Sequence, residues 1–180
     1  MSGVRAMASM KHVGLNVAGD PLYTASYIGA NGGLVFVVAD DPGLYSSQNE
    51  QDTRCVARAA LVPVLEPSDS QEAKDFMKEA FRISEEYDTP VILRTTTRLA
   101  HSQGPVTLED RVVPEDKPYE RNPAKNVMMP GMAKKRHIHV EERMDRLQED
   151  GSVSAINRAE YGDTSIGFIT SGIPDQYVKE

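Results

Sequence analysis

An uninterrupted apolar run from Leu34 to Ala39 (LVFVVA) constrains this chain more than any other stretch. Its length and its content of valine and phenylalanine are typical of a strand that is buried on both faces. Asp40 and Asp41 end the run, and Pro42-Gly43 predicts a turn, because proline fixes φ and glycine accepts unusual backbone angles. We therefore expect a central parallel strand with a polar loop, extending to Ser47, at its carboxyl end.

The residues after this loop carry a helix signal. Ser47 and Glu50 have the spacing of a capping box, which predicts a helix from about Gln48 to Ala60. Ligands of open α/β sheets bind where a strand leads through a loop to a helix N-terminus. Cys55, the single cysteine, lies in this helix among small apolar residues, so we expect a packed thiol. One cysteine also excludes an intrachain disulfide.

Strand and helix patterns alternate on both sides of this segment. Strands are expected at residues 7–13, 61–65 and 91–97, where apolar and β-branched side chains cluster. Gly14-Leu15-Asn16 is expected to form a loop after the first strand. A helix is expected from Asp20, a potential N-cap, to about Ala30, and the clearest helical stripe runs from Asp69 to Tyr87. Because this alternation is that of βαβ units, we predict an α/β fold: an open parallel sheet with helices on both faces.

The second half of the chain is less regular. Prolines and mixed charges between His101 and Asn126 indicate an extended linker, and an apolar stripe indicates a helix over residues 133–149. Residues 166–170 (IGFIT) have the pattern of an isolated buried strand, which a short C-terminal helix follows. The first strand begins almost at residue 1 and the last has no visible sheet to join, so we expect both ends to be cut.

Composition excludes several function classes. The formal charge of −7 argues against general binding to nucleic acid or to anionic membranes, and Lys134-Lys135-Arg136 is interpreted as a solvated helix end. We expect a soluble, cytoplasmic protein, because the chain shows no signal peptide and no membrane-length apolar segment. His137 and His139 would point in different directions on a helix, so no metal site is predicted.

The polar residues at the predicted strand ends have two possible interpretations. His12 lies at the end of the first strand, on the same sheet edge as Asp40, and is either a structural histidine or part of a site. Asp40 and Asp41 can be turn formers only, and Ser47 with Glu50 can be a helix cap only. Spacing alone does not separate these alternatives.

Three stretches resemble one known family: Met10–Leu22, Gly32–Asp52 and Leu65–Phe76. They are similar to the alpha subunits of indolepyruvate ferredoxin oxidoreductases, which are 2-oxoacid:acceptor oxidoreductases that depend on thiamine diphosphate. The resemblance continues through Pro90–Gly104 and Ile166–Glu180 and so covers essentially the whole chain. It implies an internal fragment of such a subunit.

The resemblance also implies a division of the chain. Residues 1–104 would be an incomplete pyrimidine-binding α/β domain of the thiamine diphosphate enzymes. Residues 105–162 would be a connector with a helix, and residues 163–180 would begin a transketolase-C-like domain. The glutamate that activates the cofactor, the magnesium motif and the cysteines of the iron–sulfur clusters would lie outside this chain. We therefore expect the isolated chain to be inactive.

The activity implied by the resemblance is the oxidative decarboxylation of aryl 2-oxoacids such as indolepyruvate to acyl-CoA, with ferredoxin as electron acceptor. The cofactor would be thiamine diphosphate with magnesium, shared with the missing domains. Iron–sulfur clusters would belong to the missing C-terminal region. The implied partners are the 2-oxoacid, CoA and ferredoxin, together with the remaining domains and a second subunit, but no nucleic acid and no membrane.

The resemblance carries over to individual positions as well. His12 and Ser47 would be catalytic, while Ser46, Gln48 and Asp40 would contact the cofactor, and no residue would bind a metal. Tyr45 stands where the family is expected to have histidine, so the chain departs from the family's pattern at that position. An alternative from another class is a non-catalytic binding or assembly module that kept the fold without the chemistry.

Overall fold

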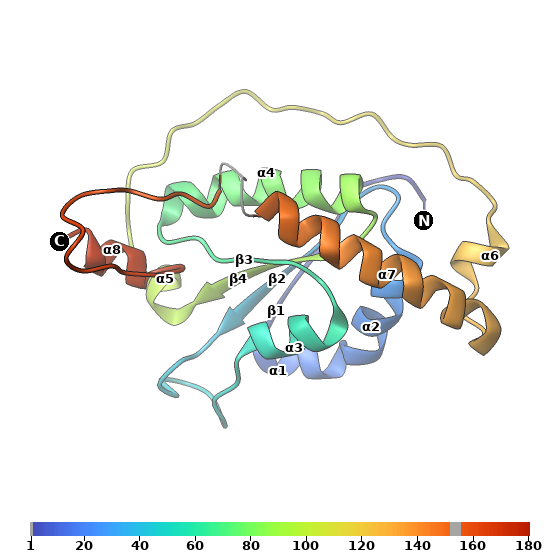
Figure 1. The fold of residues 1–180 in the computed structure, drawn as a ribbon, viewed down its shortest axis with the longest axis horizontal. Helices are drawn as coiled ribbons and strands as arrows, with labels where there is room; N and C mark the ends of the chain where they lie inside the picture. The colour runs from blue at the N-terminus through green and yellow to red at the C-terminus, as the bar shows by residue number, and fades with distance from the viewer. Residues whose placement is uncertain (1, 152–155) are drawn as a thin grey trace.

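The computed structural model describes residues 2–151 and 156–180. Met1 and residues 152–155, which belong to the predicted segments 1–104 and 105–162, lie outside the described residues. The described chain contains a four-stranded parallel sheet in the order β1-β2-β4-β3 (Figure 1). The strands are β1 (Ala6–Lys11), β2 (Leu34–Asp40), β3 (Val64–Leu65) and β4 (Val91–Thr96). The predicted parallel sheet is confirmed, and β2 is an internal strand.

Helices cover both faces of this sheet (Figure 1). One face carries α1 (His12–Val17), α2 (Gly19–Ile28) and α3 (Thr53–Ala60), and the other carries α4 (Ser70–Tyr87). The later helices are α5 (Thr97–His101), α6 (Pro123–Asn126), α7 (Pro130–Gly151) and α8 (Pro174–Val178). Between α5 and α6, residues 102–122 form an irregular segment that arches outside the sheet, as expected of a linker. No helix in the described part of the chain has the length and apolarity needed to cross a membrane.

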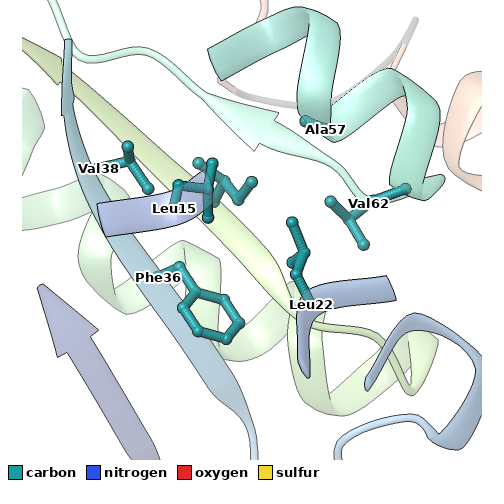
Figure 2. Packing of buried hydrophobic residues seen from close by; sticks show 8 residues of the cluster. Leu15, Leu22, Phe36, Val38, Ala57 and Val62 are labelled. Atoms are coloured by element: carbon teal, nitrogen blue, oxygen red, sulfur yellow. The ribbon is translucent and has the colours of Figure 1, made fainter. Parts of the chain in front are cut away.

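The first core cluster joins the face of α1, α2 and α3 to the sheet (Figure 2). Leu15 and Leu22 are almost completely buried and pack with Phe36 and Val38 of β2 and with Ala57 of α3. Burying a leucine side chain contributes about 1.5–3 kcal/mol, so this cluster fixes the short helices on the strands. Alternate residues of β2 therefore serve opposite faces, which is why the run is apolar throughout.

The second core cluster lies under α4. Ala80 and Ile83 of this helix pack against Val35 and Leu93, which point from β2 and β4 to the opposite face. The helix begins with the predicted capping box: Asp69 accepts the N–H of Glu72, and Glu72 in turn accepts the N–H of Ser68, both at 2.8 Å. The predicted helix with its apolar stripe and its cap is confirmed.

The segment after β1 differs from the prediction. Residues 14–16 were expected to form a loop, but they belong to α1, which begins at His12. A side chain on Gly14 would approach the Cβ of Met10 to 2.9 Å, so glycine is needed here for a close strand-to-helix approach rather than for a loop. Asp20 is not an N-cap either, because α2 begins at Gly19 and places Asp20 in its first turn.

The helix after the polar loop begins later than predicted. Asp52, rather than Ser47, caps α3 by accepting the N–H of Arg54 at 3.0 Å. The Ser47 hydroxyl donates instead to Asp41, so it is not available for a helix terminus. With this start, Cys55 is exposed, and the prediction of a packed thiol is wrong.

Residues 166–170 do not form the predicted strand. They have no regular secondary structure, and the side chains of Ile166, Phe168 and Ile169 are exposed. A strand needs a neighbour that accepts and donates ladder hydrogen bonds, and none of the described strands lies beside this segment. The short helix predicted after it is present as α8.

Helix α7 crosses the edge of the sheet where the strands begin (Figure 1). Its buried Arg143 donates to the carbonyl oxygens of Ser26, Leu61 and Asp88 at 3.0–3.2 Å. These three carbonyls lie at the C-terminal ends of α2, α3 and α4, where helix dipoles concentrate negative charge. One guanidinium therefore joins three helix ends and holds α7 on the amino edge of the sheet.

Candidate functional site

The carboxyl ends of β2 and β4 lie side by side and present polar groups. Asp40 and Thr96, the last residues of the two strands, are register partners. The loop of residues 41–52 follows β2, and α5 follows β4 directly. Lys11, at the end of β1, donates from Nζ to the carbonyl oxygen of Ser46 at 3.0 Å and so ties the loop to the third strand end. The predicted location of the polar loop is confirmed.

The carboxylate of Asp41 organises this loop from inside. It is buried and accepts hydrogen bonds from the N–H of Tyr45 at 3.2 Å, the N–H of Ser46 at 2.8 Å and the hydroxyl of Ser47 at 2.6 Å. A fourth bond comes from the Thr97 hydroxyl at 2.8 Å. The hydroxyl of Ser47 and the N–H of Ser46 hold the pKa of Asp41 well below its usual range. The loop is therefore built around a permanent negative charge.

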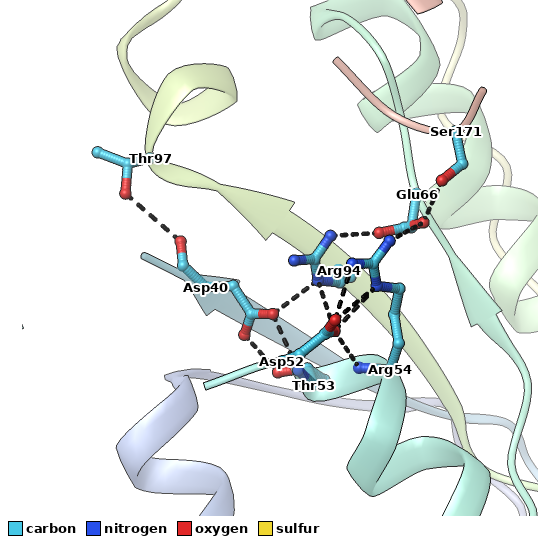
Figure 3. A network of polar contacts seen from close by, with 8 residues as sticks. All are labelled: Asp40, Asp52, Thr53, Arg54, Glu66, Arg94, Thr97 and Ser171. Atoms are coloured by element: carbon cyan, nitrogen blue, oxygen red, sulfur yellow. Dashed lines mark hydrogen bonds and ion pairs between the residues drawn. The ribbon is translucent and has the colours of Figure 1, made fainter. Parts of the chain in front are cut away.

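Asp40 has a different set of partners, which Figure 3 shows. Its buried carboxylate accepts the N–H of Thr53 at 2.9 Å and also the Thr53 hydroxyl. Nε of Arg94 donates to the same carboxylate at 2.6 Å, and this arginine also pairs with Glu66. Asp40 thus links β2, β4 and the start of α3.

Arg54 extends this network on the side of α3 (Figure 3). Its guanidinium pairs with Asp52 at 2.7 Å and approaches Glu66 to 3.8 Å. Hydrogen bonding to Asp52 raises the pKa of Arg54. Three carboxylates and two guanidinium groups are thereby interlocked at the carboxyl edge, and both guanidinium groups are paired.

A cavity of about 470 Å³ opens beside this network. Its lining comes from four regions: the polar loop, Arg54 of α3, the ends of β3 and β4 with α5, and residues 171–177. Ser171 donates to Glu66 at 2.6 Å, which holds the C-terminal segment against the network (Figure 3). Arg98 lines the cavity and donates to the hydroxyl of Tyr177, which closes the opposite side. The volume is in the range of cavities that hold small organic ligands.

The predicted site residues gather at this edge but differ in availability. Ser46 and Gln48 are exposed on the loop, whereas Ser47 is half-buried and bonded to Asp41. Asp40 is saturated by its partners and has no free face. His12 is 1% exposed, and its two ring nitrogens have no hydrogen-bond partner in the part of the chain that the structure describes.

Sequence reasoning missed the arginines of this edge. Arg94 and Arg98 lie within and just after β4, and Arg54 lies in α3. A usable signal was present, because a charged residue inside the β-branched stretch VILRTTT needs a buried partner. The arrangement can bind anions or hydrogen-bonding groups.

Among residues 2–151 and 156–180, no cluster of three or more His, Cys, Asp or Glu side chains could hold a metal ion.

The chain matches one known protein family and several curated proteins. Residues 30–161 match the family described as pyruvate flavodoxin/ferredoxin oxidoreductase, thiamine diphosphate-binding. Three curated relatives, each named indolepyruvate oxidoreductase subunit IorA, cover 99–100% of this chain. Those of Pyrococcus horikoshii and Pyrococcus abyssi are 48% identical to it, and that of Archaeoglobus fulgidus is 45% identical.

The chain spans 29% of the length of each of these relatives. The resemblance to indolepyruvate oxidoreductase subunits is confirmed by their names and by the extent of the matches. The family match covers β2, α3, β3, α4 and β4 and includes the polar loop and its arginine network. The chain therefore belongs to the thiamine diphosphate-binding family of the pyruvate flavodoxin/ferredoxin oxidoreductases.

Proposed function

We propose that this chain is part of a cytoplasmic, thiamine diphosphate-dependent oxidoreductase that acts on aryl 2-oxoacids such as indolepyruvate. The observation that carries the proposal is 48% identity over almost the entire chain to subunits named for that substrate. The organised polar loop at the carboxyl edge supports it, because that is where ligands bind in open α/β sheets. The product is acyl-CoA, and ferredoxin accepts the electrons.

Thiamine diphosphate fits the free groups at this edge. The exposed side chains of Ser46 and Gln48 would hold it, and the two unpartnered ring nitrogens of the buried His12 call for a polar partner that a bound ligand provides. When bound, the cofactor would supply carbanion and electron-sink chemistry for the 2-oxoacid. The chain's own residues orient the ligand and control protons around it.

The proposed roles of Ser47 and Asp40 follow from their hydrogen bonds. The hydroxyl of Ser47 already donates to Asp41, so Ser47 acts on catalysis by fixing the loop conformation. Asp40 is closed off by Arg94 and Thr53 and does not fit a direct cofactor contact. Asp40 therefore supports the site by holding β4 and α3 in place.

We also propose where the metal and cluster sites lie and how the chain divides into domains. Magnesium and the iron–sulfur clusters would be held by other parts of the subunit, and a second subunit completes the enzyme. Residues 1–104 form the pyrimidine-side domain, 105–162 the connector and 163–180 the beginning of the next domain. The exposed apolar side chains of Ile166, Phe168 and Ile169 support this division, because a further domain would cover them.

The test uses the full-length subunit that contains this chain, assembled with its partner. Indolepyruvate-dependent reduction of ferredoxin is measured in the presence of CoA for the wild type, Gln48→Ala and Ser46→Ala. Loss of a hydrogen bond to a charged group lowers turnover about tenfold or more. Gln148→Ala, which changes an exposed glutamine on α7, is the matched control.

Normal turnover in both loop variants would refute the assigned contacts. An assembled wild-type enzyme that reduces no acceptor with any aryl 2-oxoacid would contradict the proposed activity. It would favour the alternative of a binding or assembly module.

A further inference from the structure

We propose that the cavity at the carboxyl edge is the pocket of the aryl 2-oxoacid, in which Arg98 binds the carboxylate and Tyr45 and Tyr177 contact the aryl group. This inference rests on the proposed function and adds the pocket, the anchoring residue and the basis of substrate choice. It follows from the pairing of the charged side chains in the cavity and from the chemistry of its walls.

The charges that line the cavity are unequal. Three arginines and one glutamate face it, namely Arg54, Arg94, Arg98 and Glu66. Arg54 and Arg94 are already paired with carboxylates, and Glu66 is shared between them. Arg98 differs from both, because no carboxylate among the described residues pairs with it. The cavity therefore contains one guanidinium that forms no ion pair with the described residues.

The contacts of Arg98 leave donors available. Its side chain donates to the phenol hydroxyl of Tyr177 and lies over that ring, with 5.7 Å between the guanidinium carbon and the ring centroid. A guanidinium has five N–H groups in a planar fork that matches a carboxylate. A neutral phenol is a weaker acceptor than a carboxylate, so an incoming anion gains the stronger charge-assisted bonds. Arg98 is held in position but not neutralised.

The remaining walls suit an aromatic group. Tyr45 and Tyr177 are both largely exposed and line the cavity with Pro42, Ile173 and Pro174. Aromatic and proline side chains bury apolar surface with little loss of conformational entropy. An anion-binding end beside an aromatic wall matches a ligand with a carboxylate and an aryl ring. A diphosphate alone would leave this wall uncovered.

The position of the cavity agrees with this assignment. Tyr45 belongs to the same loop as Ser46 and is held by Asp41 through its own backbone N–H. The cavity thus adjoins the loop at which the cofactor is proposed to bind. The carboxylate of a substrate held by Arg98 would keep the adjoining carbonyl carbon near that loop.

Binding is tested on the assembled full-length enzyme with ligands that cannot react. The first ligand is 3-phenylpropionate, which has an aryl ring and a carboxylate but no keto group. The second is 3-phenylpropanol, which lacks the carboxylate, and the third is inorganic pyrophosphate. Calorimetric titrations compare the wild type, Arg98→Gln and Arg58→Gln, in which Arg58 is an exposed arginine of α3 outside the cavity.

We expect 3-phenylpropionate to bind the wild type and the Arg58→Gln control equally. Arg98→Gln should weaken its binding at least about tenfold, because a charged hydrogen bond is lost. 3-Phenylpropanol should bind the wild type more weakly and should be insensitive to Arg98→Gln. In steady-state assays, Arg98→Gln should raise the KM for the aryl 2-oxoacid while the KM for CoA stays unchanged.

Two results would overturn the assignment of the pocket. One is unchanged 3-phenylpropionate affinity and KM in Arg98→Gln while the wild type turns over normally, in which case the proposed function stands and the pocket fails. The other is pyrophosphate that binds as tightly as 3-phenylpropionate and is equally sensitive to Arg98→Gln, which would make the cavity a phosphate site. Arg98-dependent binding in an enzyme without 2-oxoacid turnover would instead support the pocket and refute the proposed function.

Discussion

The two edges of the same sheet use arginine in opposite ways. At the amino edge, Arg143 is buried, and its two terminal nitrogens donate to backbone carbonyls of three helix ends. At the carboxyl edge, Arg94 is satisfied by the side chains of Asp40 and Glu66, and a cavity opens beside them. The first arrangement closes its edge, whereas the second leaves polar groups accessible. The difference supports a structural role for the amino edge and agrees with the proposed ligand site at the carboxyl edge.

The amino edge needs a cation for a physical reason. The C-terminal ends of α2, α3 and α4 converge there, and each carries partial negative charge on carbonyls without helical partners. Burial lowers the pKa of Arg143 to about 10, so the guanidinium remains charged at neutral pH. The carboxyl edge, in contrast, receives its negative charge from side chains, which can be rearranged or replaced by a ligand.

The largest expected effect is therefore at the amino edge. Arg143→Leu removes the donor of three carbonyl groups at once, and each buried acceptor left unpaired costs about 1–3 kcal/mol. We expect the free energy of unfolding to fall by about 4 kcal/mol, as measured by urea denaturation.

Arg146→Leu is the matched control for this prediction. Arg146 lies one turn further along α7, is exposed and contacts the ring of Tyr87, with 5.5 Å between the guanidinium carbon and the ring centroid. Such a contact contributes about 0.5–1 kcal/mol at an exposed site. Equal losses in the two variants would show that Arg143 has no special role in joining the helix ends.

A smaller loss of stability is expected at the carboxyl edge. Arg94→Met leaves the buried carboxylate of Asp40 without its cation, although Thr53 still donates to it. Breaking a buried ion pair in this way costs about 3 kcal/mol. Adding Asp40→Asn to Arg94→Met removes the unpaired charge, so the double variant should be more stable than Arg94→Met alone. Additive losses in a double-mutant cycle would show that the two side chains are not coupled.

Sequence predicted the elements whose signals are local. The apolar run of β2 and the stripe and capping box of α4 follow from the residues themselves, and both are present. The predicted start of α3 was wrong because the Ser47 hydroxyl donates to Asp41 instead of capping the helix. Sequence spacing does not reveal this contact between two loop residues. Gly14 was interpreted as a loop residue, since its close approach to Met10 depends on the packing of α1.

The candidate site was predicted in outline only. The edge and the loop were located correctly, because parallel strands end together. The cavity was not predicted, because Arg98, Tyr45 and Tyr177 line it from segments that lie far apart in the sequence. The strand predicted at residues 166–170 is absent for a different reason. The apolar pattern of this segment is typical of a strand, but a strand also needs a neighbouring strand to pair with, and the local pattern does not reveal whether one is present.

The smallest expected effect is local and concerns Asp41. Its folded-state pKa lies below the usual range because the ionised form accepts hydrogen bonds from Ser47, Ser46 and Thr97. A lowered pKa means that ionised Asp41 stabilises the folded chain above the ordinary carboxyl pKa of about 4. This stabilisation is lost only as the pH falls through the lower, folded-state pKa. At neutral pH the loop should therefore be ordered, and Asp41→Asn should release it without unfolding the sheet.

Limited proteolysis with chymotrypsin measures this release, because Leu44 and Tyr45 are exposed residues of the loop that the enzyme recognises. Asp41→Asn should be cut there faster than the wild type at pH 7, and its urea unfolding midpoint should fall by less than that of Arg94→Met. Asp116→Asn, which changes an acidic residue of the extended segment, is the control. Ser47→Ala removes one of the four hydrogen bonds and should lie between the two. Cleavage of Asp41→Asn at the wild-type rate would mean that the loop is ordered by contacts other than this carboxylate.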